Sequence, residues 1–128
     1  ISSKKMEWGI KRNNNHEQPD VGKSNKKILE SNNGICLGNS EKKYIYLTFD
    51  DGPSVYTKEL LNILKEYNVK ATFFVTGNGN REYIKKAYNE GHSIGIHTYS
   101  HVYKNVYASE EAYFNDLEKV QKIIKEQN

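Results

Sequence analysis

Hydrophobic and polar positions follow two different patterns along this chain, and the change falls at Tyr44. Before Tyr44 the chain is rich in Lys, Asn, Ser and Gly, and its apolar residues show no sustained period. After it, short continuous apolar runs, typical of strands covered on both faces, alternate with segments that have a single apolar stripe, as amphipathic helices do. The pattern predicts strands at 44–49, 71–76 and 93–96, and helices at 57–67, at 81–90 and from Ser109 onwards.

Each predicted helix has an apolar stripe that can pack on the strands. The stripes are Leu60, Leu61, Leu64 and Tyr67, then Ile84, Ala87 and Tyr88, then Phe114, Leu117, Val120 and Ile124. Gly91 stands where glycine commonly ends a helix, and Ser109 has a side chain suited to an N-cap. Strands that alternate with helices predict an α/β fold with parallel strands and right-handed crossovers. Three such units fit an open sheet and a closed barrel equally well.

Composition and charge exclude several classes of protein. No run approaches the roughly 18 apolar residues of a membrane-spanning helix, and the single cysteine, Cys36, excludes an intrachain disulfide framework. The net charge of +3 arises from residues 1–43, which we interpret as a solvated polar arm with Trp8 and Ile10 as apolar anchors. These basic residues are too dispersed for a nucleic-acid surface. No apolar stretch with the pattern of a secretory signal is found near the start.

Two groups of polar residues follow predicted strands, at the edge where α/β folds place active sites. Asp50 and Asp51 follow the first strand, where one carboxylate can face a metal ion and the other a water molecule, although Asp-Gly-Pro is also a common turn. His97 and His101 would project from one side of a helical turn, either to hold one ion or as two independent histidines. Together, Asp51, His97 and His101 supply the three ligands of a catalytic zinc site with an open fourth position.

The sequence resembles the polysaccharide deacetylases, carbohydrate esterase family 4, over about residues 44–126. The resemblance rests on 48–53 (TFDDGP) and 97–101 (HTYSH), together with 71–77 and 90–95 between them. It implies a distorted (β/α) barrel, of which three units are present, and removal of N-acetyl groups from amino sugars in peptidoglycan or chitin-like chains. It also implies an extracellular or cell-wall location in a bacterium, with an N-acetylated glycan as partner.

The resemblance assigns roles to individual residues. Asp51, His97 and His101 would hold a divalent metal, zinc first, with cobalt, nickel or manganese as alternatives. Asp50 would be the general base that takes a proton from the water attacking the acetamide carbonyl. Thr98 would steady the loop through a hydrogen bond from its side chain to the backbone.

The segment before the first strand resembles a narrower subgroup of the family. Residues 8–12 (WGIKR) and 18–23 (QPDVGK) are similar to the lead-in of bacterial muramic-acid deacetylases, which form the δ-lactam of spore cortex. That subgroup often has Asn at the position of Asp51, so the intact aspartate pair favours the general metal-dependent type. His92, which precedes the third strand, we interpret as structural.

The resemblance also implies residues that the sequence does not contain. Family members continue past the last predicted helix with an Arg-Pro motif, an Asp/Trp motif and a Leu-x-His motif that supplies the general acid. No histidine follows His101, and no arginine follows Arg81. We therefore expect residues 44–128 to be the N-terminal half of a catalytic domain, with the stripe of its last helix partly exposed and little turnover from this segment alone. The alternative is a non-catalytic module that binds metal or glycan.

Overall fold

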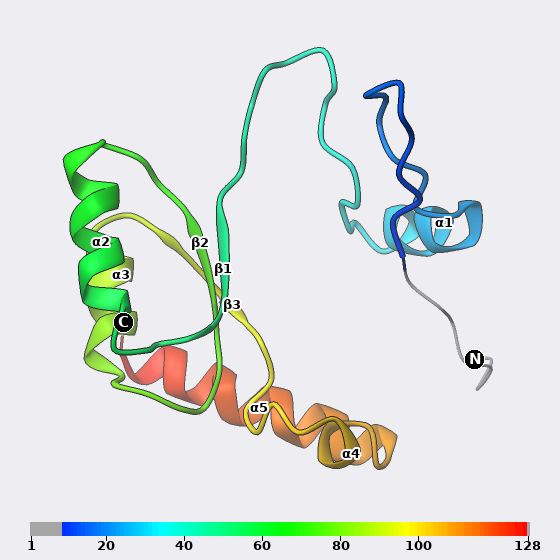
Figure 1. Ribbon diagram of the computed structural model, residues 1–128. Helices are drawn as coiled ribbons and strands as arrows, with labels where there is room; N and C mark the ends of the chain where they lie inside the picture. The colour runs from blue at the N-terminus through cyan, green and yellow to red at the C-terminus, as the bar shows by residue number, and fades with distance from the viewer. Residues whose placement is uncertain (1–8, 128) are drawn as a thin grey trace. The chain divides into compact units, whose positions relative to one another are not determined.

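The computed structural model describes residues 9–127 (Figure 1). Contacts divide the chain into two compact units, residues 1–44 and 45–128, and each unit is described separately. Within the described residues, no helix combines the length and the apolar character needed to cross a membrane.

The first unit has more regular structure than the polar pattern predicts. It contains a helix, α1 (Lys23–Ser31), and an antiparallel bridge between Lys11 and Asp20. No residue of α1 is buried. The predicted anchor Trp8 lies outside the described residues. The other, Ile10, is 59% exposed, and its packing onto the second unit stays a prediction.

The second unit is a parallel α/β arrangement, as predicted. Its sheet has the order β1-β2-β3 and consists of β1 (Thr48–Gly52), β2 (Thr72–Val75) and β3 (Ser93–Ile96). Its helices follow the strands and are α2 (Thr57–Glu66), α3 (Glu82–Asn89), the short α4 (Tyr103–Val106) and α5 (Glu110–Glu126). Helices α2 and α3 lie side by side next to the sheet, and α5 contacts β3 (Figure 1).

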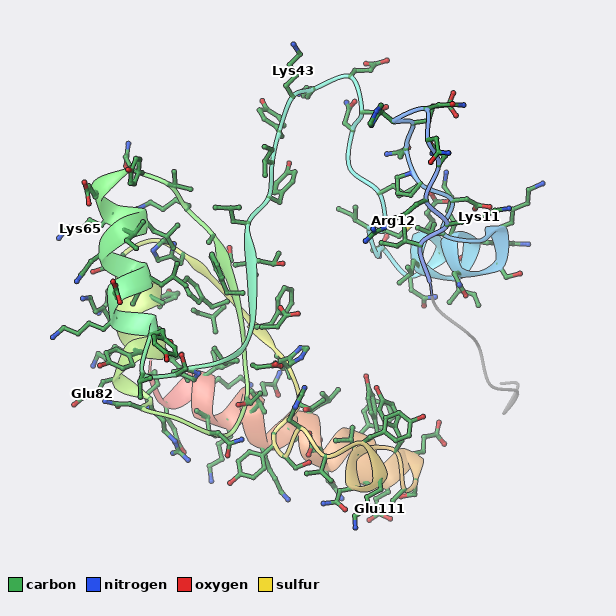
Figure 2. The ribbon with its side chains drawn as sticks, in the orientation of Figure 1. Lys11, Arg12, Lys43, Lys65, Glu82 and Glu111 are labelled. Carbon is green, nitrogen blue, oxygen red and sulfur yellow. The ribbon has the colours of Figure 1, made fainter. Side chains whose placement is uncertain are left out.

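The core of the second unit lies between the sheet and its helices. Its buried residues are Leu61, Leu64, Ala71, Phe73, Val75, Ile84, Ala87, Val120 and Ile123. Burying one such large aliphatic or aromatic side chain stabilises a fold by about 1.5–3 kcal/mol, so these residues hold the helices on the strands. Charged side chains such as Lys65 and Glu82 point away from the sheet (Figure 2).

The predicted apolar stripes are confirmed at their centres and fail near the helix ends. Tyr67, Tyr88 and Phe114 are each about half exposed or more, because strands of four or five residues offer no surface to cover them. The exposure of Phe114 confirms that the stripe of the last helix is only partly covered. Ser109 caps α5 as predicted, since its hydroxyl oxygen accepts a hydrogen bond from the Ala112 N–H at 3.0 Å.

The first strand begins later than its sequence predicts. Residues 44–47 form no strand, and Ile45 and Tyr46 are 88% and 79% exposed. Within the described residues β1 is an edge strand that pairs with β2 alone. The Leu47 carbonyl accepts a hydrogen bond from the Thr72 N–H of β2 at 3.0 Å. The prediction that this run is covered on both faces is therefore wrong.

Candidate metal centre

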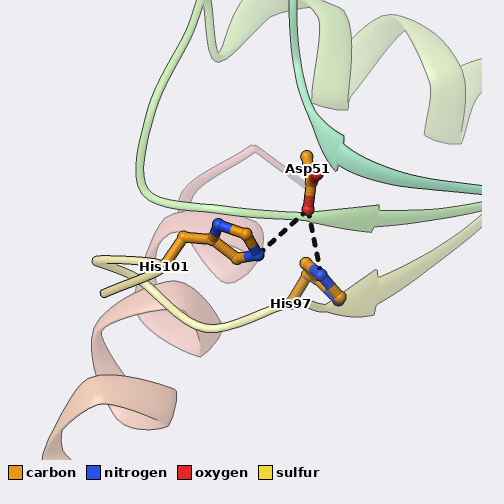
Figure 3. A group of neighbouring side chains, drawn as sticks. All are labelled: Asp51, His97 and His101. Carbon is orange, nitrogen blue, oxygen red and sulfur yellow. Dashed lines mark ion pairs between the residues drawn. The ribbon is translucent and has the colours of Figure 1, made fainter. Parts of the chain in front are cut away.

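The side chains of Asp51, His97 and His101 meet at the carboxyl ends of β1 and β3 (Figure 3). Nε2 of His97 lies 3.0 Å from Oδ1 of Asp51, and Nε2 of His101 lies 3.2 Å from the same oxygen. The two imidazole rings are stacked, with centroids 5.2 Å apart and 28° between their planes. The structure thus brings together the three residues for which the sequence predicts a shared metal ion.

An irregularity in β1 positions Asp51. Phe49 pairs with Phe73 and Gly52 pairs with Val75, so β1 contains one more residue than β2 between these two pairs. This is a β-bulge, a feature common beside active sites because it redirects a side chain. Asp51 lies in the bulge with a positive φ of 69°, which most residues other than glycine avoid. The aspartates therefore lie within the last residues of the strand, and not after it as predicted.

The distances from Asp51 to the two histidines suit a divalent cation. Two ligands bound at 2.0–2.1 Å to the same ion lie roughly 2.8–3.4 Å apart, from octahedral to tetrahedral geometry. The two observed nitrogen–oxygen distances fall within this range. The side chains of His97, His101 and Asp51 are 33%, 51% and 64% exposed, so solvent reaches the cluster and a further ligand has access to it.

The loop between the two histidines is not the helical turn that their spacing predicts. Residues 97–102 contain no helix, and Thr98 and His101 have positive φ values of 65° and 51°. The His97 N–H donates to the Val75 carbonyl at 2.8 Å, which continues the hydrogen bonding between β2 and β3 by one residue. The chain then reverses through its left-handed residues, and both imidazoles face Asp51 without a helix.

The loop is held by α5 rather than by Thr98. The Thr98 hydroxyl oxygen is buried without a hydrogen-bond partner among the described residues, so its predicted hydrogen bond to the backbone is wrong. Asp116 instead accepts hydrogen bonds from the Tyr99 N–H at 2.5 Å, the Ser100 N–H at 3.1 Å and the Ser100 hydroxyl at 2.9 Å. Asp116 belongs to no motif that predicts this role from the sequence. The available signal was its place four residues before the buried Val120, which puts a carboxylate on the covered face of the helix.

Asp116 is ionised despite being only 8% exposed. Burial raises the pKa of Asp116, but the hydrogen bonds from Tyr99 and Ser100 and the positive charge of Lys119 together outweigh burial and hold the pKa below its usual value. The loop backbone is therefore bound by a negatively charged acceptor, which makes stronger hydrogen bonds than a neutral one.

Tyr99 is also fixed from the side opposite its N–H. The Gly77 N–H donates to the Tyr99 carbonyl at 3.0 Å, and the Tyr99 ring lies next to the glycine. A Cβ atom at position 77 would lie 2.3 Å from this ring, so only glycine fits there. The middle of the loop is thus held by the segment that follows β2 as well as by α5.

Asp50, the predicted general base, is exposed near the end of β1 and lies outside the cluster of three ligand atoms. Asp50 and Asp51 are the charged members of the lining of a cavity of about 320 Å³, which also includes Phe49, Leu60 and Ile84. The carboxylate of Asp50 therefore remains available to solvent next to the cluster.

His92 lies in the core and has the structural role predicted for it. Its Nδ1 accepts a hydrogen bond from the Ala71 N–H at 3.2 Å, and its ring meets the Phe73 ring edge to face at 5.3 Å between centroids. Burial, with a smaller contribution from the charge of Lys70, lowers the pKa of His92, although Glu90 opposes the shift. The folded protein therefore favours the neutral imidazole.

This lowered pKa predicts a pH-dependent loss of stability. The unfolded chain takes up a proton on His92 below about pH 6.5 while the folded chain resists it, so the free energy of unfolding falls as pH drops below that value. His92→Asn keeps an acceptor for the Ala71 N–H but does not titrate, and we expect a flatter dependence in urea unfolding between about pH 8 and pH 5. The control His16→Asn changes an exposed histidine and should keep the slope. Equal slopes in wild type and His92→Asn would contradict the prediction.

Comparison with known proteins identifies relatives with cell-wall activities. Residues 37–127 match the family described as polysaccharide deacetylase. The chain is 41% identical over 105 residues to the peptidoglycan-N-acetylmuramic acid deacetylase PdaA of Bacillus subtilis, covering 79% of this chain and 40% of that protein. It is 41% identical over 111 residues to a peptidoglycan-N-acetylglucosamine deacetylase of Bacillus cereus, covering 84% of this chain and 38% of that protein. The chain thus spans about two fifths of the length of these curated relatives.

The solved structures that this chain resembles are also deacetylases or carbohydrate esterases. The structure of Bacillus subtilis PdaA, a family 4 carbohydrate esterase, matches 96% of this chain and 54% of its own chain at 35% identity and a TM-score of 0.80. The catalytic domain of a peptidoglycan N-acetylglucosamine deacetylase from Eubacterium rectale matches 71% of this chain and 42% of its own chain, at 49% identity and a TM-score of 0.68. These likenesses confirm the predicted fold class, three strand–helix units of a (β/α) barrel. The chain therefore belongs to the polysaccharide deacetylase family.

Proposed function

We propose that the protein is a metal-dependent hydrolase that removes N-acetyl groups from amino sugars of a cell-wall polysaccharide. The observation that carries this proposal is the convergence of both imidazole Nε2 atoms, from His97 and His101, on one carboxylate oxygen of Asp51 beside the exposed Asp50. The two curated relatives described above act on N-acetylmuramic acid and N-acetylglucosamine in peptidoglycan, which supports an N-acetylated glycan as the substrate. An extracellular or cell-wall location follows from such a substrate.

In this proposal Asp51, His97 and His101 hold the divalent ion, with zinc first and cobalt, nickel or manganese as alternatives. The ion, when bound, polarises the acetamide carbonyl and lowers the pKa of water at the site. The β-bulge holds the Asp51 carboxylate towards the histidines, and the left-handed residues Thr98 and His101 shape the loop that carries both rings. These residues therefore determine the geometry of the site before any substrate arrives.

Asp50 acts as the general base in this proposal. Its exposed carboxylate takes a proton from the attacking water as the new carbon–oxygen bond forms, and such a base typically contributes 10²–10⁴-fold to the rate. The carbon–nitrogen bond then breaks, giving acetate and a free amine on the sugar. The amine leaves with a proton from a general acid, and the family resemblance places that acid in a Leu-x-His motif that the sequence does not contain.

The proposal is tested by incubating the intact protein with N-acetylated peptidoglycan and, separately, with chitooligosaccharides. We expect acetate and new free amine in equal amounts, loss of both on chelation, and recovery when zinc is returned. Identifying which sugar has gained the amine distinguishes N-acetylmuramic acid from N-acetylglucosamine as the substrate.

The alternative function is a module that binds metal or glycan without turnover. An intact protein that contains stoichiometric metal, binds these glycans and releases no acetate would establish this alternative over the hydrolase.

A further inference from the structure

The loop that carries the two histidine ligands is attached to α5 through the buried carboxylate of Asp116. Asp116 is 8% exposed, and both of its oxygens are used: Oδ1 accepts from the Tyr99 N–H, while Oδ2 accepts from the N–H and the hydroxyl of Ser100. Tyr99 and Ser100 stand between His97 and His101 in the chain. The three hydrogen bonds therefore act on the part of the backbone that sets the separation of the two imidazoles.

We propose that Asp116 is a positioning residue, which fixes His97 and His101 for metal binding by holding the backbone between them. This inference rests on the metal site of the proposed function, but it concerns a residue that contacts neither the metal nor the substrate. Asp116 does not belong to the cluster of candidate ligands. Among the described residues, its hydrogen bonds reach the loop at Tyr99 and Ser100.

The backbone conformation explains why one carboxylate can bind two successive N–H groups. A residue with positive φ turns neighbouring N–H groups towards the same side, which creates a small concave site for an anion. Thr98, with φ of 65°, immediately precedes the two donors. The carboxylate of Asp116 occupies this concave site, and without it two partly buried N–H groups and a hydroxyl would need other partners.

The two histidines are held by different contacts. His97 is held by its hydrogen bond to Val75, as part of the ladder between β2 and β3. His101 lies beyond Ser100, is 51% exposed, and reaches the sheet through the loop and through its contact with Asp51. Loss of the carboxylate should therefore change the position of the second histidine more than that of the first.

The test compares cobalt binding by the intact protein and by Asp116→Asn, followed through the visible absorption of bound cobalt, with zinc competition for the affinity. We expect the affinity of Asp116→Asn to fall about 10–100-fold, the range for residues that orient metal ligands, together with a changed cobalt spectrum. Asp116→Glu, which restores the charge on a longer side chain, should recover part of the affinity. Glu118→Gln removes an exposed carboxylate from the same helix and should bind cobalt as the wild type does.

Equal affinity and an identical cobalt spectrum in wild type and Asp116→Asn would overturn the inference. If Asp116→Asn does not fold, Ser100→Ala decides instead, since it removes only the hydroxyl hydrogen bond; weaker cobalt binding supports the inference and unchanged binding overturns it. The proposed function fails separately, when the wild type binds cobalt but releases no acetate. A wild type that binds no cobalt overturns both the metal site and the positioning role.

Discussion

In the variant His97→Ala/His101→Ala, the intact protein is expected to lose its bound metal and, with it, acetate release. The substitution removes two of the three candidate ligands and leaves Asp51, a single exposed carboxylate, which does not retain a divalent ion in competition with water. Metal analysis after dialysis should fall from about one ion per protein to background, and acetate release should fall to the level of the chelated wild type.

The double variant should stay folded, which makes its result interpretable. His97 and His101 are 33% and 51% exposed, and truncation of such partly exposed side chains usually changes stability only slightly. Thermal unfolding of the metal-free variant should therefore match that of the metal-free wild type. The control His16→Ala removes an exposed histidine of the first unit and should keep its metal. Unchanged metal content in the double variant would show that the proposed site is wrong.

The adjacent aspartates provide the second prediction, because the same isosteric change is expected to have different effects at the two positions. Asp51→Asn should lose metal, since the oxygen shared by both histidines no longer carries a full charge. Asp50→Asn should keep its metal and lose about 10²–10⁴-fold in kcat, because the general base is gone. Metal content and acetate release are measured on both variants in parallel.

The two variants also show in which way the assignment of general base and metal ligand would be wrong. Full turnover by Asp50→Asn would exclude Asp50 as the base. Loss of metal from Asp50→Asn would instead identify it as a further ligand, which its place outside the cluster of three does not predict. Both side chains are exposed, so neither substitution leaves an unsatisfied buried group that would confuse the comparison with a folding defect.

The parts of the fold that the sequence predicts are those decided by local patterns. Helices α2, α3 and α5 lie close to their predicted ranges because an apolar stripe, a glycine after the helix or a serine cap marks each of them. The sequence does not predict the parts of the fold that depend on residues far away in the chain. Residues 44–47 have the composition of a buried strand. Within the described residues, however, β1 pairs with β2 on one side and with no strand on the other.

The site shows the same division. The identity of its three clustered residues follows from residue types placed after parallel strands, whereas the shape of the loop does not. A spacing of four residues suggests a helical turn, but the left-handed residues Thr98 and His101 achieve the same convergence. Asp116 belongs to no motif, and its role emerges only when α5 is placed against the loop.

The two histidines are aligned by different parts of the fold. His97 is fixed by the hydrogen bonds of the sheet, and His101 follows a loop attached to α5, which packs through Val120 and Ile123. The relative positions of the two histidines therefore depend on both the sheet and α5, and they change if α5 packs differently against the sheet. Substitutions of the buried residues that pack α5 are remote from the ion. They would nevertheless move the two histidines apart before they unfold the protein.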